Sequence, residues 1–316
     1  MMRRFQSVAG LAAVVLLAIV FSPAAPDGSN IFLGAGNLTD VLRQMSVIGI
    51  IALAMTYVIL TAGIDLSVGS ILALATSVTA LVLTRPMAGW SAGPHIGIAI
   101  LAALAACAAV GAINGWVISR LAIQPFIVTL AAMIGVRGLA KWLTGNANID
   151  IGFGQDEAAI FAAFFKQKAV VVGTFAALAA IFWVILTRTV FGRYVRAIGD
   201  NETASRYTGL PIRRVKVWVY TLSGLLSGLA GVLYAAENHQ GNPNAGAAYE
   251  LDAIAAVVIG GTRLSGGRGS IAGTLAGTLI MGVLTNILRL KNVDSNVEMM
   301  VKAVIIVLAV SIQKRQ

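Results

Sequence analysis

Long apolar segments alternate with short polar segments along nearly the whole chain. A bilayer core about 30 Å thick needs roughly 20 apolar residues in each helix that crosses it. The pattern predicts an all-α polytopic membrane protein with about ten transmembrane helices, at 8–25, 44–61, 67–84, 96–118, 121–144, 169–187, 217–236, 252–262, 269–289 and 297–313. The range 252–262 is short for a complete crossing. This helix is expected either to begin deeper, near Tyr249, or to contain a re-entrant element.

Basic residues favour one orientation of this topology. With a cytoplasmic N-terminus, the inner segments hold fourteen Lys and Arg residues, seven of them in the loop 188–216, and the outer segments hold seven. Such an excess is typical of cytoplasmic segments and predicts that both termini lie in the cytoplasm. Arg3, Arg4 and the apolar run that follows them resemble a signal peptide. An uncleaved first helix is favoured because many more spans follow.

Composition agrees with a single transmembrane domain over residues 1–316. The chain is 58% hydrophobic and 11% charged, with a mean hydropathy of +0.86, whereas soluble domains are about 25% charged. The net charge of +10 comes from basic residues that form no patch interleaved with aromatic residues, which argues against a nucleic-acid partner. Cys107 lies among small apolar residues, where a thiol is expected to serve packing.

The segment 188–216 is the longest and most charged inner loop. Asp200 or Asn201 is a good N-cap for a short helix through Tyr207, and Gly209 with the following proline ends that helix. An isolated helix of this length is marginal in water, so it is expected to dock on another surface. From these residues alone, a solvated anchor and a docking element are equally compatible with the loop.

Three motifs occur in the same order as in a known family. They are AGIDLSVGS at 62–70, GRYVRAIGDNETASRYTGL at 192–210 and IGGTRLSGGRGS at 259–270. Over roughly residues 10–313, the chain resembles the permease subunits of bacterial ABC importers of the ribose, xylose and galactose class. The resemblance implies a type II importer-like permease of the inner membrane that translocates a monosaccharide-class solute.

In that family the second motif is the coupling helix, which seats in a cleft of the ATPase subunit. The matching positions of this chain are Gly192, Arg193, Ala197, Ile198, Gly199, Asn201, Glu202, Ala204 and Gly209. Asp200 departs from the pattern, because the family often has glycine there. The resemblance implies three partners: an ABC ATPase subunit, a periplasmic sugar-binding protein, and a second permease that is either an identical copy or a paired homologue.

The chain lacks the residues that ATP hydrolysis requires. No G-x-x-x-x-G-K-[ST] sequence occurs in it, so ATP is expected on the partner subunit and no cofactor is expected in this chain. No nucleophile pattern stands in a cleft-forming context, and no catalytic residue is expected. His95 and His239 have no Cys or carboxylate at metal-ligand spacing, so no metal site is expected.

Charged residues inside apolar spans are costly and often mark a transport path. Asp65 and Arg137 both match positions that recur in the family, and a pathway role and a structural role stay open for each. Asp65 is also suited to cap the helix that follows it. Three acidic residues flank the outer side of the seventh and eighth spans, namely Glu237, Glu250 and Asp252. Lys302 is expected to extend from its helix toward the membrane interface.

Small residues recur at four-residue spacing in two places, Gly269–Gly273–Gly277 and Ser223–Ser227–Gly231. Such ridges let helix backbones approach each other closely in lipid. They predict helix packing and carry no information about the solute.

Two other classes of transporter remain open at this point. Branched-chain amino-acid permeases share the same broad fold, although the sequence YELDAIAAVVIGG is closer to that of the sugar class. An ion-driven secondary transporter would need several acidic residues in mid-span, and this chain has almost none. Affinity for the solute is expected to reside mostly in the binding protein, so the sequence predicts a sparsely polar pathway without a dense pocket of stacking aromatic residues.

Overall fold

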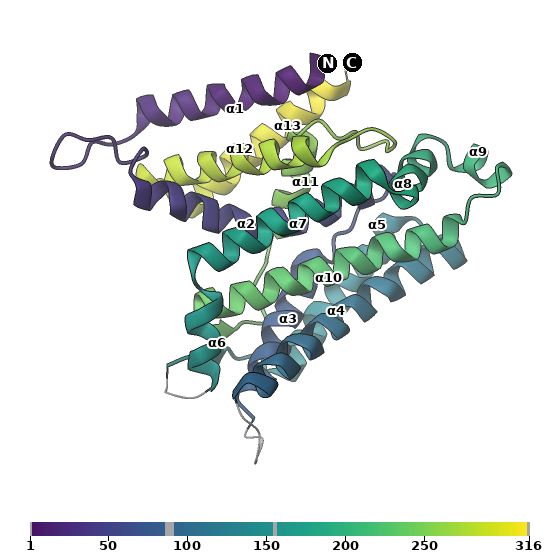
Figure 1. Cartoon of the computed structure of the whole chain (residues 1–316), viewed down its shortest axis with the longest axis horizontal. Helices are drawn as coiled ribbons and strands as arrows, with labels where there is room; N and C mark the ends of the chain where they lie inside the picture. Colours follow the sequence, from purple (N-terminus) through teal and green to yellow (C-terminus); the bar gives the residue numbers. More distant parts are fainter. Residues whose placement is uncertain (1, 86–91, 154–156, 315–316) are drawn as a thin grey trace.

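The computed structural model describes residues 2–85, 92–153 and 157–314 (Figure 1). In order, the elements are α1 (Met2–Phe21), α2 (Ala35–Leu60), α3 (Val68–Leu83), α4 (Ala92–Leu121), α5 (Pro125–Leu143), β1 (Ile149–Asp150), α6 (Glu157–Phe165), α7 (Lys168–Arg188), α8 (Val190–Asp200), α9 (Glu202–Tyr207), α10 (Ile212–Asn238), β2 (Gln240–Gly241), α11 (Tyr249–Ile259), α12 (Ile271–Leu290) and α13 (Ser295–Lys314). A helix overlaps each of the predicted spans. The prediction of an all-α membrane protein is confirmed.

Among the described residues, six helices are long and apolar enough to cross a membrane: α2, α4, α5, α7, α10 and α12. Two of them form the centre of the molecule, because 78% of the most apolar part of α2 and 72% of that of α10 is buried. For α4, α5 and α7 this share is 22%, 17% and 28%. These three peripheral helices therefore present apolar faces to lipid or to another protein.

Small residues bring α10 against its neighbours. A Cβ on Gly224 would overlap the backbone oxygen of Cys107 in α4, and one on Gly231 would lie 2.6 Å from the backbone oxygen of Leu72 in α3. The predicted ridge of Ser223, Ser227 and Gly231 thus packs inside the bundle. Cys107 is buried in this contact, as expected of a thiol that serves packing.

The segment between α10 and α11 enters the bundle instead of leaving it. Its strand β2 pairs with β1, and Asn242 then exchanges two hydrogen bonds with the Thr76 hydroxyl of α3, at 3.0 and 3.1 Å. Gly246 packs against Gly69 near the start of α3. Helix α11 begins at Tyr249, the deeper start that the sequence allowed. Protein groups cover this irregular backbone, as the membrane interior requires.

The glycine ridge of α12 is shorter than predicted. Cβ atoms on Gly273 and Gly277 would overlap backbone oxygens of Gly260 and Ala256, so these two glycines form the contact with α11. Gly269 does not belong to the helix, because α12 begins at Ile271 after the Ser270 hydroxyl caps the amide of Gly273 at 3.1 Å. Gly269 instead packs against Thr262 within the preceding turn. The three-residue helical ridge was therefore wrong at its first position.

This contact predicts a difference between two Gly-to-Ala substitutions. Gly277→Ala is expected to destabilise the protein by about 1–3 kcal/mol, because its methyl group would meet backbone that no side-chain rotation moves. Gly173→Ala in α7 has open space around the new methyl group and should be neutral or stabilising by roughly 0.5–1 kcal/mol. Thermal unfolding in detergent measures both. Equal stability of the two variants would contradict the packing described here.

Candidate functional site

The loop 188–216 forms two short helices with defined caps. The Thr189 hydroxyl accepts from the amide of Gly192 at 3.3 Å at the start of α8, and Asn201 Oδ1 accepts from the amide of Ala204 at 2.9 Å at the start of α9. Gly209, in the left-handed region with φ +78°, follows the last residues of α9. The predicted helix through Tyr207 is therefore present, with Asn201 as its N-cap.

Helix α9 is braced on one side and exposed on the other. Glu202 forms an ion pair with Lys216 of α10 at 2.7 Å and a weaker one with Arg206 at 3.5 Å, and Ser205 is buried. Tyr207 is 87% exposed. Large aromatic side chains in such positions are typical anchors of protein interfaces. The geometry thus offers a fixed helix with an exposed aromatic residue.

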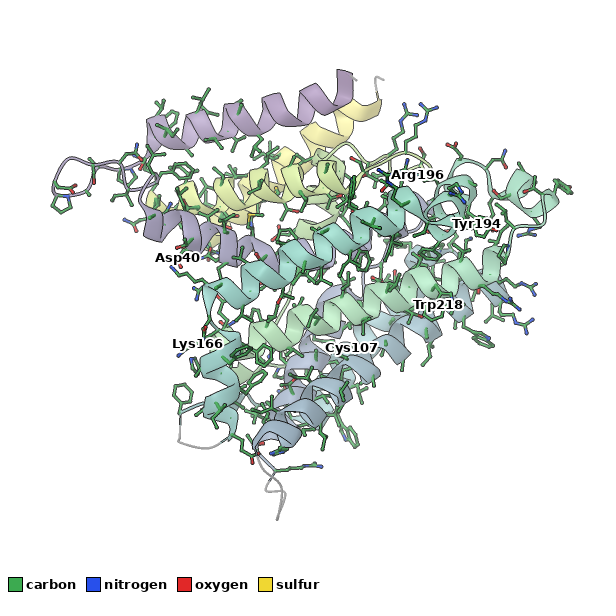
Figure 2. The ribbon with its side chains drawn as sticks, in the orientation of Figure 1. Asp40, Cys107, Lys166, Tyr194, Arg196 and Trp218 are labelled. Atoms are coloured by element: carbon green, nitrogen blue, oxygen red, sulfur yellow. The ribbon has the colours of Figure 1, made fainter. Side chains whose placement is uncertain are left out.

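Other matched residues of the loop determine its backbone conformation or lie on its surface. Gly192 allows the sharp turn between α7 and α8, because a Cβ there would overlap the backbone oxygen of Leu186. Arg193 is exposed and Ala197 is half-buried. Tyr194 and Arg196 lie at the end of the molecule opposite Lys166 (Figure 2). The loop therefore forms one end of the bundle.

The second and third sequence motifs meet the end of α2, which leads directly into the first motif, through backbone contacts. Gly267 donates its amide to the backbone oxygen of Leu60, at the end of α2, at 3.0 Å. Gly199 lies against both, since a Cβ there would overlap that oxygen and lie 2.5 Å from the Gly267 nitrogen. Gly266 and Gly267 adopt φ values of +87° and +72°, which strongly favour glycine. We call Leu60–Ala62, Gly199 and Gly266–Gly267 the motif junction.

Asp65 is fully buried in a polar cluster between α2 and α3. Its carboxylate accepts from the amide and the hydroxyl of Ser67, at 3.0 and 2.5 Å, and from the Ser223 hydroxyl of α10 at 2.7 Å. Asn114 of α4 donates to the Ser67 hydroxyl at 3.1 Å. These bonds join three segments, the α2–α3 connection, α4 and α10, so the arrangement supports a structural role of Asp65 over a direct contact with solute. Ser67 is the N-cap of α3 and no side chain caps this helix, so the expected capping role of Asp65 was wrong.

Arg137 lies elsewhere and does not pair with Asp65. Its guanidinium donates to the backbone oxygens of Pro243 and Ala245, at 2.9 and 2.6 Å, in the segment that enters the bundle before α11. This charge therefore satisfies carbonyl groups that would otherwise be unpaired within the membrane. The structural role that the sequence left open for Arg137 is therefore a bond to backbone carbonyls, and Arg137 and Asp65 form no ion pair with each other.

Lys302 does not extend to the interface. Its ammonium group pairs with Asp252 of α11 at 3.3 Å and with Glu298 at 2.9 Å, and its side chain is only 15% exposed. The expectation of a snorkelling lysine was wrong, because two carboxylates near its helix offer a closer partner than the headgroups. Arg43 of α2 and Glu237 of α10 form a similar pair at 3.3 Å.

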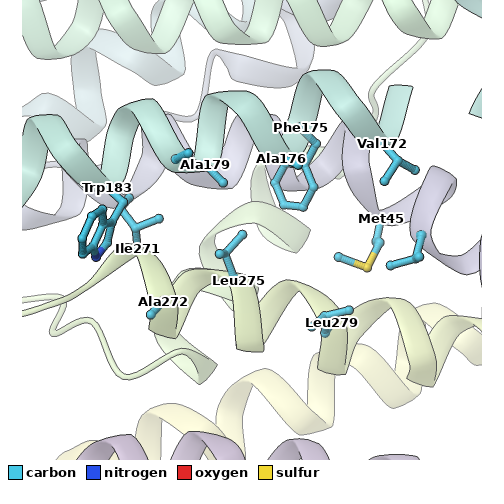
Figure 3. A pocket seen from close by; sticks show the side chains of 12 residues that line it. Met45, Val172, Phe175, Ala176, Ala179, Trp183, Ile271, Ala272, Leu275 and Leu279 are labelled. Carbon is cyan, nitrogen blue, oxygen red and sulfur yellow. The ribbon is translucent and has the colours of Figure 1, made fainter. Parts of the chain in front are cut away.

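An apolar groove of about 490 Å³ runs between α2, α7 and α12 (Figure 3). Met45, Phe175, Trp183 and Leu275 are among its lining side chains, all of which are apolar or aromatic. Sugar hydroxyls would find almost no hydrogen-bond partner here, and burying them unpaired is costly. The groove is therefore unsuited to a polar solute.

Metal-binding side chains are not clustered in the described part of the chain. Within residues 2–85, 92–153 and 157–314, no three His, Cys, Asp or Glu side chains lie close enough to hold an ion. His95 contacts the Glu157 carboxylate and the backbone oxygen of Val82. These contacts join α3, α4 and α6.

The fold is that of a polytopic membrane protein, and comparisons with known proteins show its class. Residues 37–310 match the family described as branched-chain amino acid transport system / permease component, and the chain belongs to that family. It is 42% identical to the ribose import permease of Escherichia coli K12, covering 97% of this chain and 92% of the relative. It is 40% identical to the ribose import permease of Bacillus subtilis 168 (97% and 91%) and 36% to the fructose import permease of Rhizobium meliloti (96% and 85%). No solved structure matches the chain.

These findings settle the class of transporter. The chain is a permease subunit of a sugar ABC importer and a multi-pass inner-membrane protein. The amino-acid permease alternative is not favoured, because the named relatives import sugars.

Proposed function

We propose that α9 is the element through which a separate ATPase subunit drives this permease. The observation that carries the proposal is the pairing of a capped, braced helix with an exposed Tyr207 in a chain that has no Walker-A sequence. At the other side of α9, the motif junction ties α8 to the ends of α2 and of the turn before α12. A displacement of α9 would be transmitted to α2 and to α12 through this backbone contact.

The proposed topology has ten spans with both termini in the cytoplasm. The excess of basic residues in the inner segments supports this orientation. So does the arrangement in Figure 1, where α1 begins and α13 ends toward the side that carries α8 and α9. Because the ATPase is cytoplasmic, docking of α9 on it would place α9, and with it both termini, on the cytoplasmic side.

The proposed solute is a monosaccharide delivered by a periplasmic binding protein to the opposite end of the bundle. The names of the relatives, which specify ribose, fructose and allose, support a pentose or hexose. ATP would bind only to the partner subunit. No catalytic residue is assigned to this chain.

A second permease copy is proposed on the open face of α5. This helix is the least buried of the six apolar spans, and Gly135 and Gly138 on it have no atom of another segment within 4 Å. Small residues on a lipid-exposed helix allow a second helix to approach closely. The mass of the purified complex decides between one copy and two.

The docking proposal is tested by replacing Tyr207 with alanine. Loss of a central aromatic anchor typically costs about 2 kcal/mol or more, so affinity for the ATPase is expected to fall by roughly 30-fold, with ATP-driven uptake lost. The unfolding temperature should not change, because the side chain packs on little of its own chain. Binding of the purified ATPase to the permease in detergent measures the effect.

Phe153→Ala is the matched control, because this aromatic residue is 77% exposed and belongs to the opposite end of the bundle. It should bind the ATPase as the unmodified chain does. Glu202→Lys is also expected to abolish transport while leaving the protein inserted. The new lysine would reverse the charge on α9 and would be repelled by Lys216, the present partner of Glu202. Normal ATPase affinity of the Tyr207→Ala protein would refute docking through α9.

A further inference from the structure

A cluster of aromatic and charged side chains lies at the outer ends of α10 and α11. Tyr234 and Tyr249 meet edge to face, with ring centroids 6.2 Å apart. Glu237, one turn beyond Tyr234, is paired with Arg43 of α2 at 3.3 Å. Tyr249 begins α11, one turn before Asp252. Three helices thus bring these five side chains together.

The cluster has hydrogen-bonding groups that the protein does not use. Neither the Tyr234 nor the Tyr249 hydroxyl has a hydrogen-bond partner in the described part of the chain, and the buried Nε of Arg43 has none either. Neither tyrosine hydroxyl is among the buried groups that lack a partner, so both are open to solvent, whereas Arg43 Nε is buried. A ligand with several hydroxyl groups would find a hydrogen-bond partner in each tyrosine hydroxyl.

The charges of the cluster are balanced. Glu237 is paired with Arg43, and Asp252 with Lys302. A relay for protons or sodium needs carboxylates that exchange their ion, whereas these carboxylates already have fixed cations. A neutral solute that both donates and accepts hydrogen bonds fits this environment better. The partial exposure of Glu237 (19%) and Asp252 (16%) leaves their oxygens within reach of such a solute.

We propose that Tyr234, Tyr249, Glu237 and Arg43 form a transient contact site for the monosaccharide in the outer half of the permease. The site receives the sugar as the binding protein releases it. Aromatic rings cover the apolar faces of the sugar, and the hydroxyl, carboxylate and guanidinium groups bind its hydroxyls. The proposal rests on the importer function proposed above and adds the residues that hold the solute.

The double variant Tyr234→Phe/Tyr249→Phe tests the site, because it removes two hydroxyls that bind nothing in the protein and keeps both rings. The complete transporter, with its own ATPase and binding protein, is reconstituted in vesicles with radiolabelled ribose, fructose or allose, whichever the unmodified complex imports. Each lost hydrogen bond to a neutral hydroxyl weakens contact by roughly two- to tenfold. Sugar imported per ATP hydrolysed is therefore expected to fall at least about threefold. Stimulation of the ATPase by the loaded binding protein and the unfolding temperature should not change.

Tyr57→Phe is the matched control, because its hydroxyl donates to the backbone oxygen of Phe182 at 2.5 Å. It should lower the unfolding temperature and leave the ratio of sugar to ATP unchanged. The proposal is overturned if the double variant keeps the normal ratio, or if it loses stability as the control does. An unmodified complex whose ATPase ignores the loaded binding protein would refute the importer function itself, and this site with it.

Discussion

Replacing Gly199 with alanine is expected to reduce sugar uptake by at least about tenfold. The new methyl group would overlap the backbone oxygen of Leu60 and crowd the amide of Gly267. Both are backbone atoms, so no change of side-chain rotamer relieves the overlap, and overpacking of this kind costs about 1–3 kcal/mol or more. The motif junction would have to open, which separates α8 from the ends of α2 and of the turn before α12.

The effect should appear in transport more strongly than in insertion. Because the junction links α8, the helix before α9, to the ends of α2 and of the turn before α12, the Gly199→Ala complex is expected to hydrolyse ATP with little uptake. Gly97→Ala in α4 is the control, since its methyl group meets no atom within 4 Å. Uptake and ATP hydrolysis measured together in vesicles separate the two variants. Normal uptake by the Gly199→Ala complex would show that the junction plays no part in coupling.

Much of the fold follows from local properties of the sequence. Apolar runs near 20 residues place the long helices, since the bilayer fixes their length. The short helix α9 is predictable from its cap at Asn201 and from the left-handed residue Gly209, because both act within a few positions of the helix ends. The start of α11 at Tyr249 follows from the shortness of its apolar run.

What the sequence did not predict depends on contacts between distant segments. The motif junction joins Leu60, Gly199 and Gly267, which no local rule brings together. Lys302 was expected at the interface because its partner Asp252 lies fifty positions earlier, on another helix. Gly269 has the spacing of a ridge, yet the cap at Ser270 starts the helix after it.

The pathway itself shows the same limit. The sequence predicted a sparsely polar route because affinity for the solute was expected to reside mostly in the binding protein, and the groups of the proposed sugar site lie on three separate helices, α2, α10 and α11. The structure gathers Arg43, Tyr234 and Tyr249 at one level of the bundle. The prediction that affinity for sugar lies mostly in the binding protein stays a prediction, and a small cluster of this kind is compatible with weak, transient contact.

Uptake driven by ATP is the central claim, and one measurement tests it most directly. The chain is reconstituted in vesicles with its ATPase and binding protein, and uptake of labelled sugar is followed while the proton gradient is collapsed and ATP is maintained. The account predicts uptake at its full rate, and none when ATP or the binding protein is left out, because the membrane carboxylates Glu237 and Asp252 are held by fixed cations. Concentrative uptake by the permease alone under an imposed proton or sodium gradient would contradict it.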